Sequence, residues 1–92
     1  MIKSFIHKGL QKFYENGTTK GIQFEHSNKI KMRLTALDTA RVLEDIALPG
    51  FYLHELKGDK AGIYSIKVSA NWRITFRFKD GDVEIVNYED YH

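Results

Sequence analysis

The residues best suited to chemistry lie in two short segments, one in the middle of the chain and one at its end. The last three residues, Asp90-Tyr91-His92, combine a carboxylate, a phenol ring and an imidazole. An imidazole exchanges protons near neutral pH, and an adjacent carboxylate orients it. His54 supplies a second imidazole three residues before Lys57. These residue types predict general acid–base chemistry.

Lysine and arginine side chains add positive charge to the same region. If residues 69–71 form a three-residue loop, Lys67 and Arg73 lie opposite each other on neighbouring strands. Two like charges in register destabilise a sheet unless water screens them or an anion lies between them. A phosphate fits this position, and two solvated side chains that spread apart fit it equally well. Together with Lys57, these cations suit a crowded oxyanion such as a phosphorane.

The sequence offers no pattern that would hold a metal ion or a cofactor. The four histidines, at positions 7, 26, 54 and 92, do not have the spacing of metal ligands. The chain has no cysteine, which excludes a disulfide framework, a thiolate metal site and a thiol nucleophile. We therefore expect no metal and no cofactor. His7 and His26 are expected to be exposed surface residues near helix starts.

Charge is distributed unevenly along the chain, although the net charge is only +2. Residues 1–33 and residues 57–79 each carry a net +5, whereas residues 34–56 carry −3 and residues 80–92 carry −5. Such asymmetry is typical of a surface that meets a polyanion on one side. Scattered solvating charge explains a +5 segment about as often.

Length and composition describe one domain over residues 1–92. A chain of 92 residues with 42% hydrophobic side chains buries roughly 60 to 70% of its unfolded surface on folding. The first residues lack the apolar core of a signal peptide, and no segment is long enough to cross a bilayer. We therefore expect a soluble cytoplasmic protein that does not enter a membrane.

Two helices are expected in the first half of the chain. Residues 2–6 suit a strand, and the helical period of residues 7–16 predicts a helix that Gly17 ends. A second helix is expected from about Glu25 or Ser27. Its apolar stripe consists of Ile30, Leu34 and Leu37. Its charged surface consists of Lys29, Lys31 and Arg33.

The second half of the chain has the period of strands. Thr39 is expected to cap a short turn through Ile46, and Pro49-Gly50 ends the helical half. Aromatic and β-branched residues then predict four strands, over residues 51–56, 62–68, 72–79 and 82–88. Asp80-Gly81 between the last two is a strong signal for a two-residue hairpin turn.

These turns fix a strand register. A two-residue turn at Asp80-Gly81 and a three-residue loop at 69–71 keep the large apolar side chains on one face and the charged ones on the other. The pairs expected are Lys79 with Asp82, Phe78 with Val83, Arg77 with Glu84, Phe76 with Ile85, Arg73 with Tyr88, Val68 with Trp72, Ile66 with Ile74, and Tyr64 with Phe76.

Four segments together resemble the HigB toxins of the RelE/ParE superfamily. They are Leu53–Asp59, Gly62–Ile66, Asn71–Phe78 and Asn87–His92. The likeness extends nearly from end to end and includes the opening Met-Ile-Lys-Ser-Phe. The Leu-Lys-Gly and Asn-Trp-Arg-Ile-Thr-Phe blocks, with the Asp-Tyr-His ending, are specific in combination.

The resemblance implies a fold, an activity and partners. The fold is α+β, a RelE-like microbial RNase fold in which an N-terminal strand and two helices pack on an antiparallel β-sheet. The activity is that of a type II toxin that cleaves mRNA in the ribosomal A site by metal-independent attack of the ribose 2′-OH, which inhibits translation and growth. The implied partners are a HigA-like antitoxin, the small subunit of the bacterial ribosome and mRNA.

The resemblance also implies roles for single residues. His54, Asp90, Tyr91 and His92 match the catalytic cluster of the family. His92 is the leading acid–base group, Asp90 orients it or shares its role, and His54 handles a second proton or contacts the phosphate. Tyr91 stacks on a base or donates to a phosphate oxygen.

Positively charged residues complete the implied site. Lys57 and Arg73 match basic residues of the family at its RNA-binding surface. Some relatives carry a further arginine where this chain has Ser69, so phosphate binding is expected to depend more strongly on Lys57, Lys67 and Arg73.

Two functions of other classes remain open from sequence. A ParE-like toxin of the same fold binds gyrase without catalysis, but such toxins lack the Asp-Tyr-His type of ending. A module that binds RNA or the ribosome without cutting it would use the same basic and aromatic groups, because these serve binding and catalysis alike.

Overall fold

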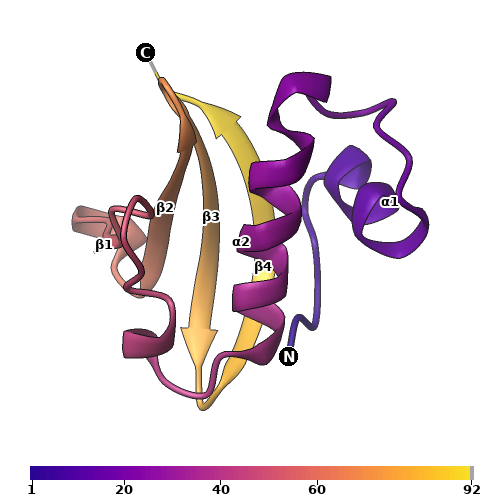
Figure 1. Cartoon of the computed structure of the whole chain (residues 1–92). Coiled ribbons are helices and arrows are strands. Elements are labelled where there is room, and N and C mark those ends of the chain that lie inside the picture. Colours follow the sequence, from indigo (N-terminus) through magenta and orange to yellow (C-terminus); the bar gives the residue numbers. More distant parts are fainter. Residues whose placement is uncertain (92) are drawn as a thin grey trace.

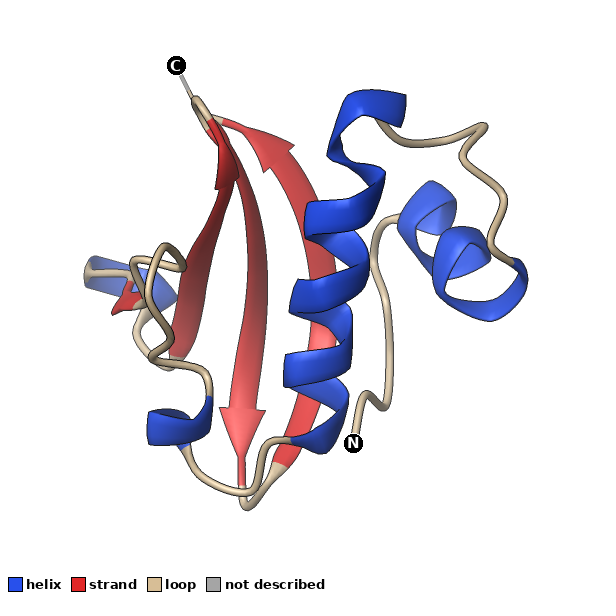
Figure 2. Cartoon of the chain, viewed as in Figure 1, coloured by secondary structure: helices blue, strands red, loops and turns tan. Residues whose placement is uncertain are grey.

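A computed structural model, which describes residues 1–91, consists of a four-stranded antiparallel sheet and two helices, of which the longer crosses in front of the sheet and the shorter lies to its side (Figures 1 and 2). The strands lie side by side in chain order. They are β1 (His54–Glu55), β2 (Ile63–Ser69), β3 (Trp72–Lys79) and β4 (Asp82–Asp90). This arrangement confirms the α+β class.

The helices are α1 (Lys8–Asn16) and α2 (Ser27–Thr39). His7 is the N-cap of α1, and its Nδ1 accepts a hydrogen bond of 3.0 Å from the Leu10 amide. Gly17 ends the helix with a φ of 78°. Helix α2 lies across one face of the sheet, and α1 lies beyond it on the outside (Figure 1).

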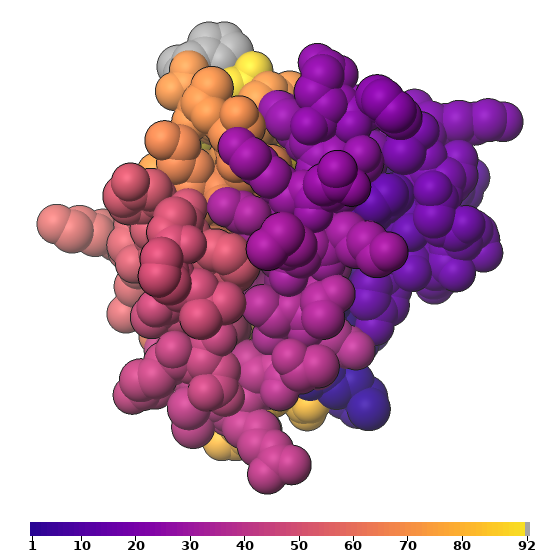
Figure 3. Space-filling view, viewed as in Figure 1, coloured from indigo at the N-terminus to yellow at the C-terminus, as the bar shows by residue number. Residues whose placement is uncertain are grey.

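The core fills the space between α2 and the sheet. The predicted apolar stripe of α2 is buried there, together with Phe76 and other alternate residues of the strands. Burying a side chain of this size contributes about 1.5 to 3 kcal/mol. In Figure 3 the face toward the viewer is formed by α2 and the segment that follows it. The helices therefore occupy one face of the sheet and leave the other to different residues.

The N-terminal segment pairs with β4 in parallel. Isolated bridges join Ile2 to Val83 and Phe5 to Val86, and the Lys3 amide donates to the Val83 carbonyl at 2.7 Å. The predicted strand over residues 2–6 is thus present as two bridges. Its pairing covers the free edge of β4.

A bulge in β4 shifts the expected register. Arg77 lies opposite Glu84, as predicted, but Thr75 lies opposite Asn87, so β4 holds one extra residue in between. Ile85 has a φ of 49° there, and its amide donates to Ser4 Oγ at 2.8 Å. Bulges of this kind move all later side chains to the other face.

Two of the expected pairs in β4 are therefore wrong. Arg73 lies opposite Glu89 rather than Tyr88, and Phe76 has no single partner because the bulge lies opposite it. Tyr88 instead lies opposite Ile74 and is buried on the core face. The pairs closer to the Asp80-Gly81 turn are confirmed, and both turn residues have positive φ.

The loop between β2 and β3 is also shorter than expected. Ser69 lies opposite Trp72, so the loop holds only Ala70 and Asn71, and the expected pair of Val68 with Trp72 is wrong. An irregularity between Lys67 and Ser69 absorbs the extra residue and leaves the other predicted pairs of this hairpin intact, including Lys67 with Arg73.

Two other expectations about secondary structure are wrong. The strand over residues 51–56 is reduced to His54–Glu55, because Tyr52 has a φ of 50° that extended backbone does not allow. Thr39 ends α2 and caps nothing after it. The next turn begins instead where the Asp45 carboxylate accepts hydrogen bonds from the Arg41 and Val42 amides.

Arg33 is buried rather than part of the charged surface of α2. Only 7% of its surface is exposed. Its guanidinium donates to the carbonyls of Lys67 at 2.6 Å and Gly50 at 3.4 Å, and lies 4.4 Å above the Phe51 ring. Burial lowers the pKa of Arg33 below its ordinary value. The carbonyl oxygens and the ring face compensate the buried charge.

His7 and His26 are half-buried, which contradicts their expected exposure. His26 Nδ1 lies 2.6 Å from the Tyr88 hydroxyl, and the His7 ring meets the Tyr88 ring edge-on with centroids 5.4 Å apart. Trp72 stacks on Tyr88 at 4.5 Å. Both histidines therefore belong to an aromatic cluster that packs against the end of β4.

Candidate active site

The face of the sheet opposite the helices carries most of the predicted site. Side chains alternate along a strand, so the buried core residues of β2, β3 and β4 point to the helices and their neighbours point away. We call this second surface the open face. Its polar side chains are Ser65 and Lys67 on β2, Arg73 and Thr75 on β3, and Asn87 and Glu89 on β4.

A groove lies where the segment after β1 meets the end of β4. Its volume is about 520 Å³, and it is lined by Leu56, Lys57, Lys60, Glu89, Asp90 and Tyr91. The structure thus brings together three of the predicted residues, Lys57, Asp90 and Tyr91. Backbone pairing places Tyr91, because its amide donates to the Asn71 carbonyl at 2.8 Å.

The aromatic cluster of His7, His26, Trp72 and Tyr88 lies on the core side of the sheet and holds the end of β4 that borders the groove. Tyr88 is only 4% exposed. Burial raises the pKa of Tyr88 above its ordinary value, and the charges of Glu25 and Asp90 add to this, against a hydrogen bond with the Gln23 backbone. A neutral phenol packed between rings holds the backbone that carries Glu89, Asp90 and Tyr91.

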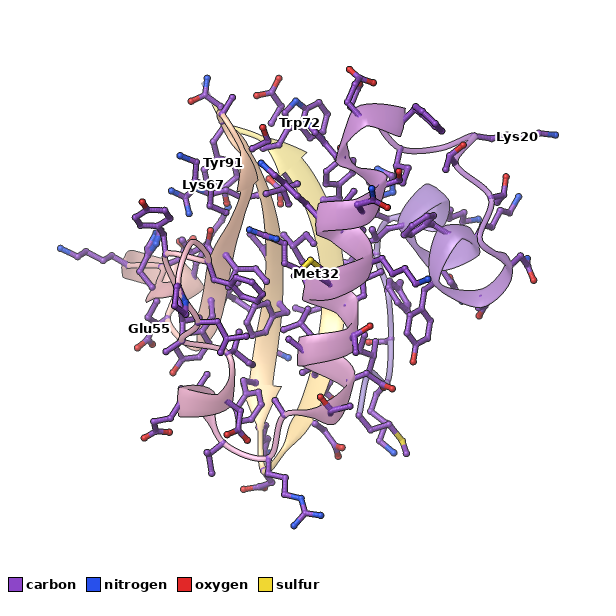
Figure 4. All side chains as sticks on the ribbon, in the orientation of Figure 1. Lys20, Met32, Glu55, Lys67, Trp72 and Tyr91 are labelled. Atoms are coloured by element: carbon purple, nitrogen blue, oxygen red, sulfur yellow. The ribbon has the colours of Figure 1, made fainter. Side chains whose placement is uncertain are left out.

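Lys67 and Arg73 lie opposite each other, as the register predicted. Their side chains reach different partners. Arg73 Nη1 donates to Ser65 Oγ at 3.2 Å, whereas the Lys67 ammonium lies 5.3 Å from the centre of the Tyr52 ring. The two cations therefore spread apart in the structure. Lys67 and Tyr91 are drawn at the same end of the sheet, and Lys20 lies at the far side of the molecule (Figure 4).

The two predicted histidines differ in how well they are placed. His54 of β1 lies opposite Ser65 of β2, so both side chains are on the open face. Its exposed ring has Nδ1 3.4 Å from the Tyr52 carbonyl, and it does not line the groove. His92 lies outside the described residues. The terminal Asp90-Tyr91-His92 cluster is therefore described for its first two members.

The open face holds a carboxylate that the sequence analysis missed. Glu89 Oε1 accepts hydrogen bonds from Thr75 Oγ1 at 3.3 Å and from Asn87 Nδ2 at 2.8 Å. A period of two counted backward from Tyr91 places Glu89 and Asn87 on one face with it. In the sequence analysis, faces were assigned by alternation starting from the Asp80-Gly81 turn. The extra residue at Ile85 reverses that alternation, so Glu89 was not recognised as an open-face residue.

A second, smaller hollow adjoins the groove. Its volume is about 170 Å³. It shares Leu56, Lys60, Glu89 and Tyr91 with the groove. Its other lining residues are Ile6, Ile63, Thr75, Ile85 and Asn87. The open face thus has a charged compartment beside a largely apolar one.

Residues 1–91 contain neither a cluster of metal ligands nor a membrane-spanning helix. No three His, Asp or Glu side chains in this range are grouped so that they could hold a metal ion. None of the helices in the same range has the length and apolar character that spanning a membrane requires.

Comparison with known proteins identifies the family. A family model described as the RelE-like toxin of type II toxin-antitoxin system HigB matches residues 3–92. The chain is 51% identical to Endoribonuclease HigB of Proteus vulgaris over the full length of both chains. It is 32% identical to Toxin HigB-1 of Vibrio cholerae serotype O1, over 100% of this chain and 98% of the relative.

Solved structures of low sequence identity share the fold. The YoeB-YefM complex from Staphylococcus aureus matches with a TM-score of 0.63 and 18% identity, over 100% of this chain and 98% of the other. A mutant of YafQ from E. coli matches with a TM-score of 0.61 and 17% identity, over 98% and 91%. With the family match over nearly the whole sequence, the chain belongs to the HigB-like, RelE-like toxins of type II toxin-antitoxin systems.

Proposed function

We propose that this chain is an endoribonuclease toxin that cleaves mRNA in the ribosomal A site. The observation that carries the proposal is its full-length identity of 51% with a protein named Endoribonuclease HigB. The groove supports it, because a lysine, a carboxylate and a tyrosine, Lys57, Asp90 and Tyr91, line one concave surface at the end of β4. Cations and aromatic rings in a groove are the usual means of holding single-stranded RNA.

The proposed reaction is a transfer of the phosphodiester to the neighbouring 2′-oxygen. The ribose 2′-OH loses its proton to a base and attacks the adjacent phosphorus. The bond from phosphorus to the 5′-oxygen then breaks, and an acid protonates that oxygen. The products are a 2′,3′-cyclic phosphate and a 5′-hydroxyl, so all atoms are accounted for without a metal.

The side chains divide these tasks. His92 is the leading acid–base group, Asp90 orients it or shares its role, and His54 is the second proton-handling or phosphate-contacting group. Lys57, Arg73 and Lys67 stabilise the charge of the phosphorane.

We further infer that the ribosome completes the site. Among residues 1–91 few general bases lie on the open face, so a substrate held in line for attack would gain much of its reactivity from positioning. The A site of the small subunit would supply that positioning. The expected protein partner is a HigA-like antitoxin, and the structural neighbour YoeB was solved in complex with YefM.

Primer extension on a defined message in programmed ribosomes tests the proposal. Wild-type protein should produce discrete breaks at A-site codons. His92→Ala should slow cleavage by about 10²- to 10⁴-fold, the usual contribution of general acid–base catalysis, and Lys57→Ala should slow it at least about tenfold.

Lys79→Ala is the matched control for Lys57→Ala. Lys79 lies at the opposite end of the sheet, across from Asp82, so its loss should leave the breaks unchanged. Intact message with folded wild-type protein on the ribosome would overturn the nuclease and favour a binding toxin, for which DNA gyrase supercoiling is the next assay. Full activity of His92→Ala would remove the role given to that residue.

A further inference from the structure

The smaller hollow of the open face has a volume and a lining that suit a site for one ring. Its volume of about 170 Å³ equals the space of roughly six water molecules at about 30 Å³ each. Ile6, Ile63 and Ile85 form apolar walls, and one side opens to the groove through shared residues. An apolar pocket with a few convergent polar groups is typical of a specific ligand site.

Two of the polar side chains of the hollow, Lys60 and Tyr91, can donate hydrogen bonds and are shared with the groove. The other three, Thr75, Asn87 and Glu89, form a connected group that presents acceptors. Thr75 and Asn87 each donate to Glu89 Oε1, at 3.3 and 2.8 Å. The Thr75 hydroxyl then keeps an acceptor lone pair, and Asn87 keeps its Oδ1. Within residues 1–91 no hydrogen bond reaches Glu89 Oε2. A ligand that offers N–H donors therefore complements this lining.

We propose that this hollow, the base pocket, binds one nucleobase of the RNA and prefers a base that carries an exocyclic amino group. Adenine, cytosine and guanine each present amino N–H groups, whereas uracil presents two carbonyl oxygens and one ring N–H. Glu89 is the residue that makes this distinction, and Asn87 and Thr75 hold its carboxylate in place.

The position of the base pocket fits a nucleotide that spans both compartments. This inference rests on the proposed function, since Lys57 and Lys60 in the groove would hold the neighbouring phosphates. Tyr91 lines both compartments. Unpaired RNA bases are commonly splayed out and bound on their polar edges in this way.

Binding of nucleoside monophosphates to the isolated protein tests the base pocket without requiring cleavage. The methyl signals of Ile6, Ile63 and Ile85 should shift in NMR spectra when AMP, CMP or GMP is added. UMP should bind about tenfold more weakly. Equal affinity for all four nucleotides, or shifts confined to residues outside the base pocket, would overturn the inference.

Glu89→Gln tests the residue. An amide places a donor where the carboxylate offers only acceptors, while its remaining oxygen still accepts from Thr75 and Asn87. In this variant UMP should bind about as tightly as AMP, CMP and GMP. Glu84→Gln is the matched control, because it removes the same charge from the same strand opposite Arg77, outside both compartments, and should keep the preference.

The two proposals fail in different ways. If wild-type protein binds AMP, CMP and GMP selectively but leaves ribosome-bound mRNA intact, the nuclease is overturned and the base pocket stands. If mRNA is cut but the four nucleotides bind equally, the base pocket is overturned and the nuclease stands. The nucleotide ranking of the wild-type protein needs no variant, so a Glu89→Gln protein that did not fold would leave that test decisive.

Discussion

Tyr88 and Glu89 are neighbours in the chain with opposite environments. Tyr88 is buried among rings on the core face, and its hydroxyl meets His26. Glu89 lies on the open face, where it accepts hydrogen bonds from Thr75 and Asn87. A one-residue slip of β4 would exchange them, burying a carboxylate among rings and exposing the phenol. The penalty for such a buried charge makes the register unambiguous.

His7 is the residue whose titration should make stability depend on pH. Its Nδ1 accepts from the Leu10 amide, so it must be unprotonated. Burial lowers the pKa of His7, which the bond with its own backbone opposes. The folded state therefore binds a proton less readily than the unfolded state, whose His7 has a pKa of about 6.5. The free energy of unfolding should fall as pH decreases through that value, and level off below the folded pKa.

Urea unfolding between pH 5 and pH 8 measures this dependence. His7→Asn keeps a side-chain acceptor at the helix start but does not titrate. Its profile should be flatter than that of the wild type over the acidic half of the range. Profiles of equal slope would show that His7 does not carry the effect.

At the scale of elements, the bulge in β4 determines which side chains of this strand lie on the open face. The N-terminal segment stabilises the bulge, since Ser4 Oγ accepts from the Ile85 amide at 2.8 Å. Ser4→Ala removes that acceptor. We expect the free energy of unfolding to fall by about 0.5 to 1.5 kcal/mol and the Ile85 amide to exchange with solvent faster. Urea unfolding and hydrogen exchange measure the two effects.

Ser4→Thr is the control for this change, because threonine keeps the hydroxyl. It should retain slow exchange at Ile85. If Ser4→Ala exchanged this amide as slowly as the wild type, the hydroxyl would have no part in holding the bulge.

The sequence predicted the helices and strands better than it predicted which face of the sheet each side chain of β4 occupies. The Asp80-Gly81 turn, the stripe Ile30, Leu34 and Leu37, and the pair Lys67 with Arg73 follow from local preferences and alternation, and the structure confirms them. At the bulge, the Ile85 amide donates to Ser4, 81 residues away in the chain. No local pattern reveals such a contact, so Glu89 was missed and Tyr88 was placed on the wrong face.

At the scale of the whole molecule, both helices lie on one side of the sheet, so within residues 1–91 the open face is left without a helical cover (Figure 1). Helix α2 covers the core face (Figure 1). Pocket residues on the open face come from the N-terminal segment, the segment after β1 and all three long strands. The candidate site is therefore a product of the tertiary fold, and its roles for His54, Lys57, Asp90 and Tyr91 stay predictions until tested.

Arg33 joins the two layers. It extends from α2 to the carbonyl of Lys67, whose own amide donates to the Phe51 carbonyl. The Arg33 guanidinium thus connects helix α2, strand β2 and the segment that leads to His54. A charged residue on a helix normally faces solvent. The sequence pattern therefore predicted an exposed Arg33, whereas the structure buries it.

Replacing Arg33 with lysine should weaken this connection while keeping the charge. An ammonium lacks the planar fork that serves the carbonyls of Lys67 and Gly50 together. We expect Arg33→Lys to lower the free energy of unfolding by about 1.5 to 3 kcal/mol, measured by urea denaturation. Arg41→Lys, at an exposed position, is the matched control and should change it by less than about 0.5 kcal/mol. Equal stability of the two variants would mean that charge alone, and not the guanidinium geometry, holds the layers together.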